Sequence, residues 1–184
     1  MKIIVMDVQK GLVCDELYQV DRFIENTARV IAAARENRVE IIYVQHDNGP
    51  GSGFTAGDEA FEIADQVKPR EGEKVFTKKH GSCFGNPDFK SYLESDGEDT
   101  LIIMGLVTDQ CVDTTVKCAF EHGYRVIIPE GTNSTFDNKY MTAETAVRFF
   151  NDAVWRDWFA TVLTVDETVA LLKEQPFNRV SGGA

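Results

Sequence analysis

The chain has 184 residues, 43% of them hydrophobic, which suffices for one buried core and is too few for two ordinary domains. Its formal net charge of −11 opposes binding to nucleic acid or to anionic lipid. No stretch approaches the roughly 20 apolar residues that cross a bilayer, and the N-terminal residues lack the cleavage site of a secretory signal. We therefore expect one cytoplasmic domain over residues 1–184 that acts on a small molecule, with no nucleic-acid or membrane partner.

Short runs rich in Val and Ile alternate with longer segments of helical period, a pattern typical of βα units around a parallel sheet. The expected strands are 2–8, 40–45, 74–77, 100–105, 124–129 and 160–164. The expected helices are 21–38, one opening at 86–88, 110–122, 142–151 and 166–174. The predicted fold class is α/β: a three-layer, doubly wound sandwich with a six-stranded parallel sheet in the order 3-2-1-4-5-6.

The first helix should turn an apolar stripe toward the sheet, formed by Phe23, Ile24, Ala28, Ile31 and Ala32.

Helix starts are marked by capping residues. Asn86 precedes Pro87 at the first position of a helix, and a further cap is expected between Thr164 and Asp166. Thr108 and Asp109 should cap the helix that follows the fourth strand.

Two segments break the alternation. Residues 46–57 are rich in glycine and are interpreted as a pocket lid or a plain surface loop, because their glycines lack the spacing of a dinucleotide-binding turn. Residues 178–184 have no core pattern and are expected to be a frayed tail or an arm onto a neighbouring subunit.

Three residues that are distant in sequence should converge where the strand order reverses, since ligands of open α/β sheets bind at that crevice. Asp7 leaves the first strand, Lys78 ends the third and Cys111 follows the fourth. Each has an ordinary interpretation: a turn carboxylate for Asp7, a solvated lysine for Lys78, and a small buried hydrophobe for Cys111. Together they suggest a nucleophile beside a base, and adjacent Lys79 is the better candidate for a solvated lysine.

The motifs around these residues resemble those of the isochorismatase-like cysteine hydrolases. Residues 4–9 (IVMDVQ) are similar to the family's opening strand ending in D-x-Q, and 78–84 (KKHGSCF) are similar to its K-x-x-x-S-x-F. Residues 105–112 (GLVTDQCV) resemble its G-x-x-T-x-x-C-V turn, and Thr115 and then Gly123-Tyr124 follow. The resemblance covers roughly residues 2–135, with the motifs in the family's order.

The resemblance implies a mechanism and a site geometry. Asp7 would be the base, Cys111 the nucleophile that forms a thioester, and Lys78 the cation that favours the ionised forms of both. The backbone amides of Val107 and Cys111 would form the oxyanion hole, with a cis peptide bond between Leu106 and Val107. Gln9, His46, Phe84 and Phe136 are candidates for substrate binding.

No metal or other cofactor is expected. Nicotinamidases of this family bind a metal through an aspartate and several histidines, whereas this chain has only His46, His80 and His122 and no second histidine near the first. His46 would then orient substrate or be an ordinary loop histidine, and His122 should be a favourable charge at a helix end. The four cysteines are expected to be reduced, because no secretory signal is present, and the absence of a C-x-x-C pair leaves a zinc site unsupported.

Three functions remain open at this point. The leading one is hydrolysis of a C–N bond in a small amide, carbamoyl or lactam substrate through the Asp7–Lys78–Cys111 triad. The alternatives are hydrolysis of an enol ether of the isochorismate type, which the cysteine in an intact motif disfavours, and a non-catalytic metabolite-binding α/β protein. The resemblance also implies a homo-oligomer, a dimer or a tetramer.

Overall fold

Six parallel strands form the central sheet in the order β3-β2-β1-β4-β5-β7, which confirms the predicted fold class and order. The computed structural model describes residues 1–95 and 97–174. The strands are β1 (Lys2–Met6), β2 (Glu40–His46), β3 (Lys74–Lys78), β4 (Thr100–Leu106), β5 (Arg125–Pro129) and β7 (Thr161–Leu163). A two-residue strand that the sequence did not suggest, β6 (Asn133–Ser134), pairs with the last two residues of β4.

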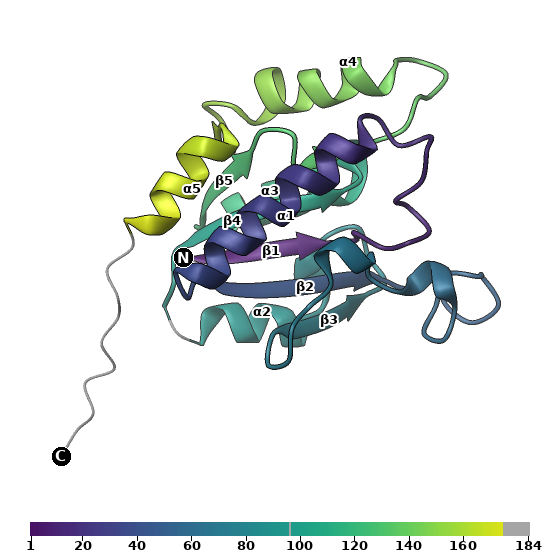
Figure 1. Cartoon of the computed structure of the whole chain (residues 1–184), viewed down its shortest axis with the longest axis horizontal. Coiled ribbons are helices and arrows are strands. Elements are labelled where there is room, and N and C mark those ends of the chain that lie inside the picture. Colours follow the sequence, from purple (N-terminus) through teal and green to yellow (C-terminus); the bar gives the residue numbers. More distant parts are fainter. Residues whose placement is uncertain (96, 175–184) are drawn as a thin grey trace.

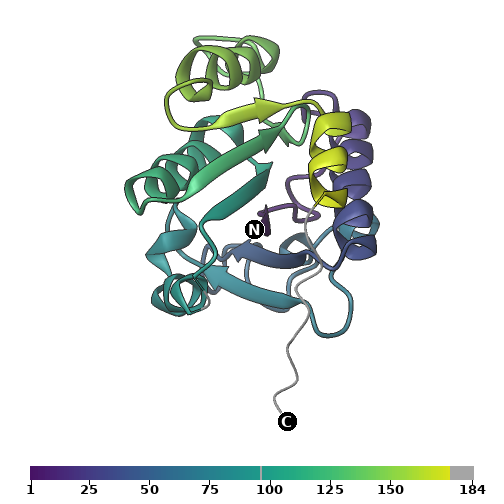
Figure 2. The same cartoon turned by 90° about the vertical axis from the view of Figure 1, so that its left-hand side faces the viewer.

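Helices cover both faces of this sheet, so the molecule has three layers (Figures 1 and 2). On one face, α1 (Val20–Glu36) lies beside α5 (Val165–Lys173). The other face carries α2 (Pro87–Glu94), α3 (Asp113–Glu121) and α4 (Ala143–Arg148). Helix α4 continues directly into the π-helix η5 (Phe149–Trp155). Alternate residues of β1 and β2 enter two separate core clusters, one under each helical layer, because successive strand side chains point to opposite faces.

The buried stripe of α1 differs in part from the predicted one. Phe23 and Ile31 are buried as expected, but Ala32 is exposed, and the stripe continues through Val30 and Ala34. The helix has 3.6 residues per turn, so Ala32 lies about 100° around the axis from Ile31 and faces solvent.

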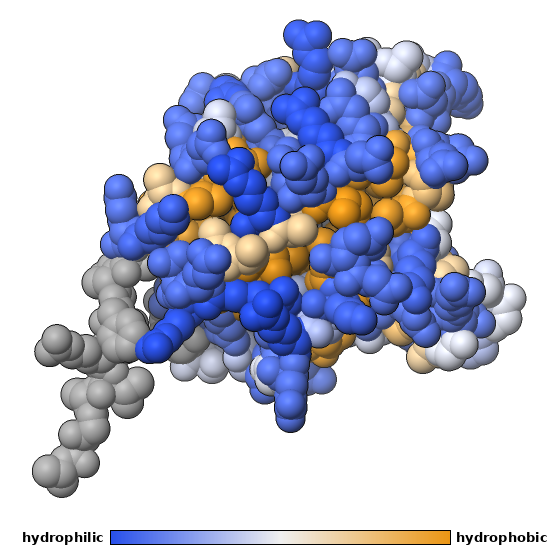
Figure 3. Space-filling model, viewed as in Figure 1, coloured by the Kyte–Doolittle hydropathy of each residue, from blue (hydrophilic) through white to orange (hydrophobic). Residues whose placement is uncertain are grey.

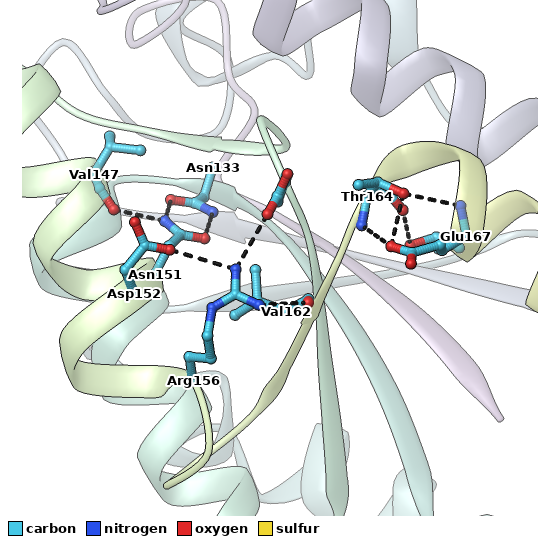
Figure 4. Close-up of polar contacts among 10 residues, drawn as sticks. Asn133, Val147, Asn151, Asp152, Arg156, Val162, Thr164 and Glu167 are labelled. Atoms are coloured by element: carbon cyan, nitrogen blue, oxygen red, sulfur yellow. Dashed lines mark hydrogen bonds and ion pairs between the residues drawn. The ribbon is translucent and has the colours of Figure 1, made fainter.

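Two of the predicted caps are confirmed. The Asn86 side chain accepts hydrogen bonds from the amides of Asp88 and Phe89, with Pro87 at the first helical position of α2. Thr164 and Glu167 form a reciprocal capping box at the start of α5 (Figure 4).

The glycine-rich loop after β2 folds back on itself, because the Asn48 amide donates to the Phe54 carbonyl over 3.0 Å. Its role as a lid stays a prediction, and the predicted tail 178–184 lies outside the described residues. Short helical turns follow at η1 (Glu59–Phe61), η2 (Asp65–Val67) and η3 (Cys83–Gly85). In the face shown in Figure 3, polar side chains surround a band of hydrophobic ones. None of the helices in residues 1–95 and 97–174 is long and apolar enough to span a membrane.

Candidate active site

The site lies where β1, β3 and β4 end. Strands β1 and β4 are adjacent and in register there, with Met6 opposite Gly105. A Cβ atom on Gly105 would lie 1.9 Å from the Met6 carbonyl oxygen, and Gly105 has a φ of 140°, so only glycine lets the two strands approach this closely. Asp7, the next residue, has a left-handed φ of 55°, and its amide still donates to the Val44 carbonyl of β2. The position of the Asp7 backbone is therefore fixed by β4, which packs against Met6, and by β2, which accepts the hydrogen bond of the Asp7 amide.

Asp7, Lys78 and Cys111 meet as the sequence predicted. The Lys78 Nζ atom lies 2.7 Å from Asp7 Oδ2 and donates a hydrogen bond to Cys111 Sγ over 3.3 Å. Asp7 is 1% exposed and Lys78 is 2% exposed, whereas Cys111 is partly accessible. Asp7 Oδ1 is buried and has no hydrogen-bond partner among the described residues. An anion, a cation and a reachable thiol thus share one small buried volume.

His46 completes the surroundings of the lysine. It pairs with Lys78 in the parallel register of β2 and β3, and the His46 Nδ1 atom lies 3.0 Å from Lys78 Nζ. The His80 carbonyl oxygen lies 3.1 Å from the same nitrogen. Because an ammonium group only donates, His46 Nδ1 is the acceptor of this bond and carries no proton. The three N–H bonds of Lys78 are therefore shared among four acceptors.

Burial and charge set the protonation states. The pKa of the Cys111 thiol is raised to about 11, first by burial and then by the charge of Asp7, against the attraction of Lys78. Burial also raises the pKa of Asp7 above its ordinary value, against the attraction of Lys78. For Lys78 burial acts to lower the pKa, but the charge and hydrogen bond of Asp7 together with the nearby cysteine sulfurs outweigh it, and the pKa is raised. At neutral pH the thiol is neutral and the lysine is charged, so sulfur must lose its proton during attack.

The turn that carries Cys111 is wider than an α-helix. It is the π-helical turn η4 (Thr108–Val112), after which α3 begins. The Val107 carbonyl accepts from the amides on either side of Cys111, those of Gln110 and Val112, each over 3.2 Å. The peptide bond between Leu106 and Val107 is cis, which confirms the expectation that the resemblance gave.

Thr108 and Asp109 do not cap this turn, so that prediction is wrong. The residue before the turn is Val107, and no side chain caps its first amides. Thr108 Oγ1 donates instead to Asn133 Oδ1 over 2.8 Å, and the Asp109 carboxylate accepts from Thr135 Oγ1 over 2.5 Å. Both side chains face the segment after β5, because a wider turn directs them away from its own amides.

One set of potential metal ligands occurs among the described residues. Donor atoms of Asp7, His46 and Cys111 lie within 4.8 Å of one another. The Lys78 ammonium contacts each of these three residues, at 2.7, 3.0 and 3.3 Å, and so occupies the position between them. A second cation there would face the charge of Lys78 at close range, so this donor set fits a protonated lysine and does not fit a metal ion.

Gln9 reaches the edge of the site, but its polar atoms already have partners. It is fully buried, and its Oε1 atom accepts from the His46 amide over 2.8 Å. Its Nε2 atom donates to the carbonyls of His46, over 3.1 Å, and Phe61, over 2.8 Å. Gln9 thus holds the backbone of His46, and contact with substrate stays a prediction.

The two aromatic candidates lie in different surroundings. Phe84 stacks on His122 with ring centroids 4.9 Å apart and packs edge-on against Phe89, in the layer of α2 and α3, and its contact with substrate stays a prediction. Phe136 is partly buried against the same core cluster as Val107, on the opposite face of the sheet. Substrate contact by Phe136 stays a prediction.

The remaining cysteines are free thiols. Cys83 is fully buried, and burial raises its pKa to about 12, so it is a poor nucleophile beside Cys111. Cys118 is partly buried. Lys79 is exposed, as predicted.

Sequence reasoning missed the polar residues that support the site from a distance. Asn133 contacts Thr108 directly, and Asn151 contacts Asn133. The sequence carries no signal for these contacts, since single asparagines in a loop and a helix are common. The contact between His46 and Lys78 could have been found, because both residues end neighbouring parallel strands.

The sequence and the fold are both similar to those of known proteins. The family model described as "Isochorismatase domain" matches residues 2–167. The uncharacterized isochorismatase family protein YrdC of Bacillus subtilis (strain 168) is 30% identical over 151 residues, 79% of this chain and 80% of that protein. The crystal structure of an isochorismatase from Pseudomonas putida KT2440 has a TM-score of 0.85 and 29% identity, over 90% of this chain and 88% of that one. N-carbamoylsarcosine amidase of Arthrobacter sp. is 30% identical over 131 residues, 61% of this chain and 50% of that protein.

Proposed function

Because the chain belongs to the isochorismatase family, we propose that it hydrolyses a C–N bond in a small amide, carbamoyl or lactam substrate through a thioester on Cys111. The observation that carries this proposal is the position of Lys78 Nζ, 2.7 Å from Asp7 Oδ2 and 3.3 Å from Cys111 Sγ in a buried site. The similarity to N-carbamoylsarcosine amidase supports the choice of a C–N bond.

In the proposed first step, Cys111 attacks the substrate carbonyl while Asp7 accepts the thiol proton. The raised pKa of the thiol makes a base necessary, and the raised pKa of Asp7 makes this carboxylate a better proton acceptor than an ordinary one. The unpartnered Asp7 Oδ1 is free to receive the proton. The backbone amides of Val107 and Cys111 are the proposed oxyanion donors, each worth roughly 2.7 to 4 kcal/mol in such sites.

In the proposed later steps, protonated Asp7 gives its proton to the leaving nitrogen as the C–N bond breaks, and the thioester remains. A water molecule then loses a proton to Asp7 and attacks the thioester carbonyl. As the C–S bond breaks and the acid is released, Asp7 returns this proton to the sulfur and the Cys111 thiol is restored. Lys78 keeps its proton throughout and offsets the negative charge that moves between Asp7 and the sulfur. His46, whose Nδ1 atom has Lys78 as a partner, remains a candidate for contact with substrate through its other ring nitrogen.

The test is a panel of small amides, ureas and lactams assayed for ammonia or amine release, with intact-protein mass spectrometry of samples quenched during turnover. We expect release with at least one compound and a mass increase on Cys111 that equals the acyl group. Turnover of isochorismate without an adduct would instead support the enol ether alternative. Binding of compounds without turnover, together with an unreactive Cys111, would support a non-catalytic protein.

The cytoplasmic location and the homo-oligomer are also proposals. Tyr140 is 81% exposed and Trp158 is 75% exposed, and large apolar side chains that protrude this far are common at contacts between subunits. Sedimentation at several concentrations is expected to give a dimer or a tetramer. A monomer throughout the range would contradict the proposed assembly.

A further inference from the structure

We propose that Asn151 and Trp155 are positioning residues that hold both ends of the turn carrying Cys111. This turn, residues 108–113, is called the nucleophile turn below. Asn151 and Trp155 lie in η5, about 40 positions further along the chain, and neither is assigned to the reaction by any motif. The inference rests on the proposed function, since it concerns the same nucleophile.

The first contact runs from Asn151 through Asn133 to the start of the nucleophile turn. The two asparagine carboxamides face each other and exchange hydrogen bonds of 3.0 and 3.1 Å (Figure 4). Asn133 Oδ1 accepts a further bond from Thr108 Oγ1 over 2.8 Å. Asn133 is 2% exposed, Asn151 is 7% exposed and Thr108 is fully buried. A buried polar group that loses its hydrogen-bond partner destabilises the fold. The side chains of Asn133, Asn151 and Thr108 therefore hold one another in a single arrangement.

The second contact reaches the other end of the turn. Trp155 is fully buried, and its Nε1 atom donates to Asp113 Oδ1 over 2.9 Å. The other oxygen of Asp113 accepts from Lys117 Nζ over 2.7 Å, so the carboxylate has a fixed orientation. Asn151 and Trp155 are four positions apart, which places them on one side of their helix and lets both face the sheet together.

The π-helical winding of η5 permits this double contact. The Arg156 amide donates to the Asn151 carbonyl, five positions earlier, over 3.2 Å. Asn151 Nδ2 donates to the Val147 carbonyl over 2.8 Å as well as to Asn133. The side chain of Asn151 thus joins the helix that carries it to the loop after β5, as drawn in Figure 4.

Cys111 lies between the two points of contact, Thr108 and Asp113. A displacement of about 1 Å in a reacting group can cost roughly a hundredfold in rate. Because the sulfur is partly accessible and only Lys78 donates a hydrogen bond to it among the described residues, its position depends on the turn that bears it. The contacts from η5 therefore set where the nucleophile stands relative to Asp7.

The first test needs no substrate. Hydrogen exchange of the peptide covering the nucleophile turn is followed by mass spectrometry in Asn151→Leu, Trp155→Phe and a control, Leu172→Ala. Leu172 is fully buried in α5, in the core cluster on the other face of the sheet, so its loss lowers the melting temperature without touching the turn. We expect about tenfold faster exchange in the turn for the first two variants and no change for the control at equal temperature below melting. Equal exchange in all three proteins would overturn the proposal.

The second test uses the best substrate from the amide panel. Asn151→Leu is expected to lower kcat about tenfold with KM within about twofold, because the turn shifts while the pocket walls remain. Thr108→Val breaks the same chain of hydrogen bonds at its other end, between Thr108 and Asn133. The kcat of the double variant Thr108→Val/Asn151→Leu should therefore be no lower than that of the slower single variant. Additive losses would show that Asn151 acts by another route and would overturn the assignment. Faster exchange in a protein that turns over no amide would sink the proposed function and leave the positioning contacts standing.

Discussion

The buried ammonium of Lys78 has more acceptors than protons to donate. Three N–H bonds are shared among Asp7, His46, the His80 carbonyl and Cys111, and the contact with sulfur is the longest of the four. When Asp7 takes up a proton it becomes a weaker hydrogen-bond acceptor. Lys78 can then form a stronger hydrogen bond to the sulfur or to a bound oxyanion. Because four acceptors surround Lys78 Nζ, the ammonium can stabilise negative charge on Asp7 or on the sulfur with only a small movement.

Replacement of Cys111 by alanine tests the nucleophile. We expect Cys111→Ala to lose at least about a thousandfold in kcat, since it removes the thiol that Lys78 contacts over 3.3 Å and Cys83 is fully buried, with thermal stability nearly unchanged. The measurement is product release at saturating substrate. Cys118→Ala, in α3 directly after the turn, is the matched control and should retain activity. A Cys111→Ala protein that works at the normal rate would exclude the thioester.

The raised pKa of Cys111 gives a prediction about alkylation. Below about pH 11 the neutral thiol predominates, and the thiolate fraction rises about tenfold for each pH unit. The rate constant for iodoacetamide at Cys111 should therefore keep rising from pH 7 to pH 10, with a slope near one on a logarithmic scale. Peptide mapping separates Cys111 from Cys83, which is fully buried. A plateau reached by about pH 8 would mean a preformed thiolate beside Lys78 and would refute the neutral resting state.

The place taken by Lys78 predicts the response to metals. Incubation with a chelator should leave the rate of substrate hydrolysis unchanged. The Lys78 ammonium already lies between Asp7, His46 and Cys111, where a metal ion would have to bind. Lys78→Ala should bind Co²⁺ with the absorption band of a cobalt–thiolate bond, whereas the unaltered protein should not. Activity that falls with the chelator and returns with added zinc would contradict this prediction.

At the scale of elements, the close approach of β1 and β4 fixes the edge from which Asp7 and the nucleophile turn leave. We expect Gly105→Ala to lower the free energy of unfolding by more than about 3 kcal/mol, because its Cβ would lie 1.9 Å from the Met6 carbonyl. Urea unfolding followed by circular dichroism measures the change. Gly81→Ala is the control: its nearest neighbour, Thr114 Oγ1, is 3.6 Å away, and it should change stability by less than about 1 kcal/mol. A Gly105→Ala protein of normal stability would show that the two strands can separate at no cost.

The strands were predictable from sequence because burial on both faces produces runs such as residues 2–6, and the helix starts were predictable where Asn86 or Thr164 supplies a cap. The triad followed from the strand order and from the family motifs. The π-helical windings η4 and η5 were not predictable, since they depend on contacts such as that of Asn151 with Asn133, which joins segments 18 positions apart. The two-residue strand β6 is too short to leave a pattern.

At the scale of the whole molecule, the triad is assembled from three separate strands. Asp7 follows β1, Lys78 ends β3 and Cys111 follows β4, so the site exists only while the centre of the sheet is intact. We expect urea to abolish activity over the same concentration range in which Cys83 becomes open to alkylation, because Cys83 is buried in the core. Loss of activity at clearly lower urea would show that the site opens before the sheet does.

The central place of β1 also has a consequence for synthesis of the chain. Residues 2–6 leave the ribosome before β2 and β4, and β2 can pair with one side of them early, but β4 begins only at Thr100. At about 5 to 20 residues per second, the second side of β1 waits roughly 5 to 20 seconds for its partner. Throughout that interval a strand made of Lys-Ile-Ile-Val-Met has an open edge in the nascent chain. The strand that positions Asp7 is therefore also a segment of the nascent chain whose apolar edge stays open to other strands during synthesis.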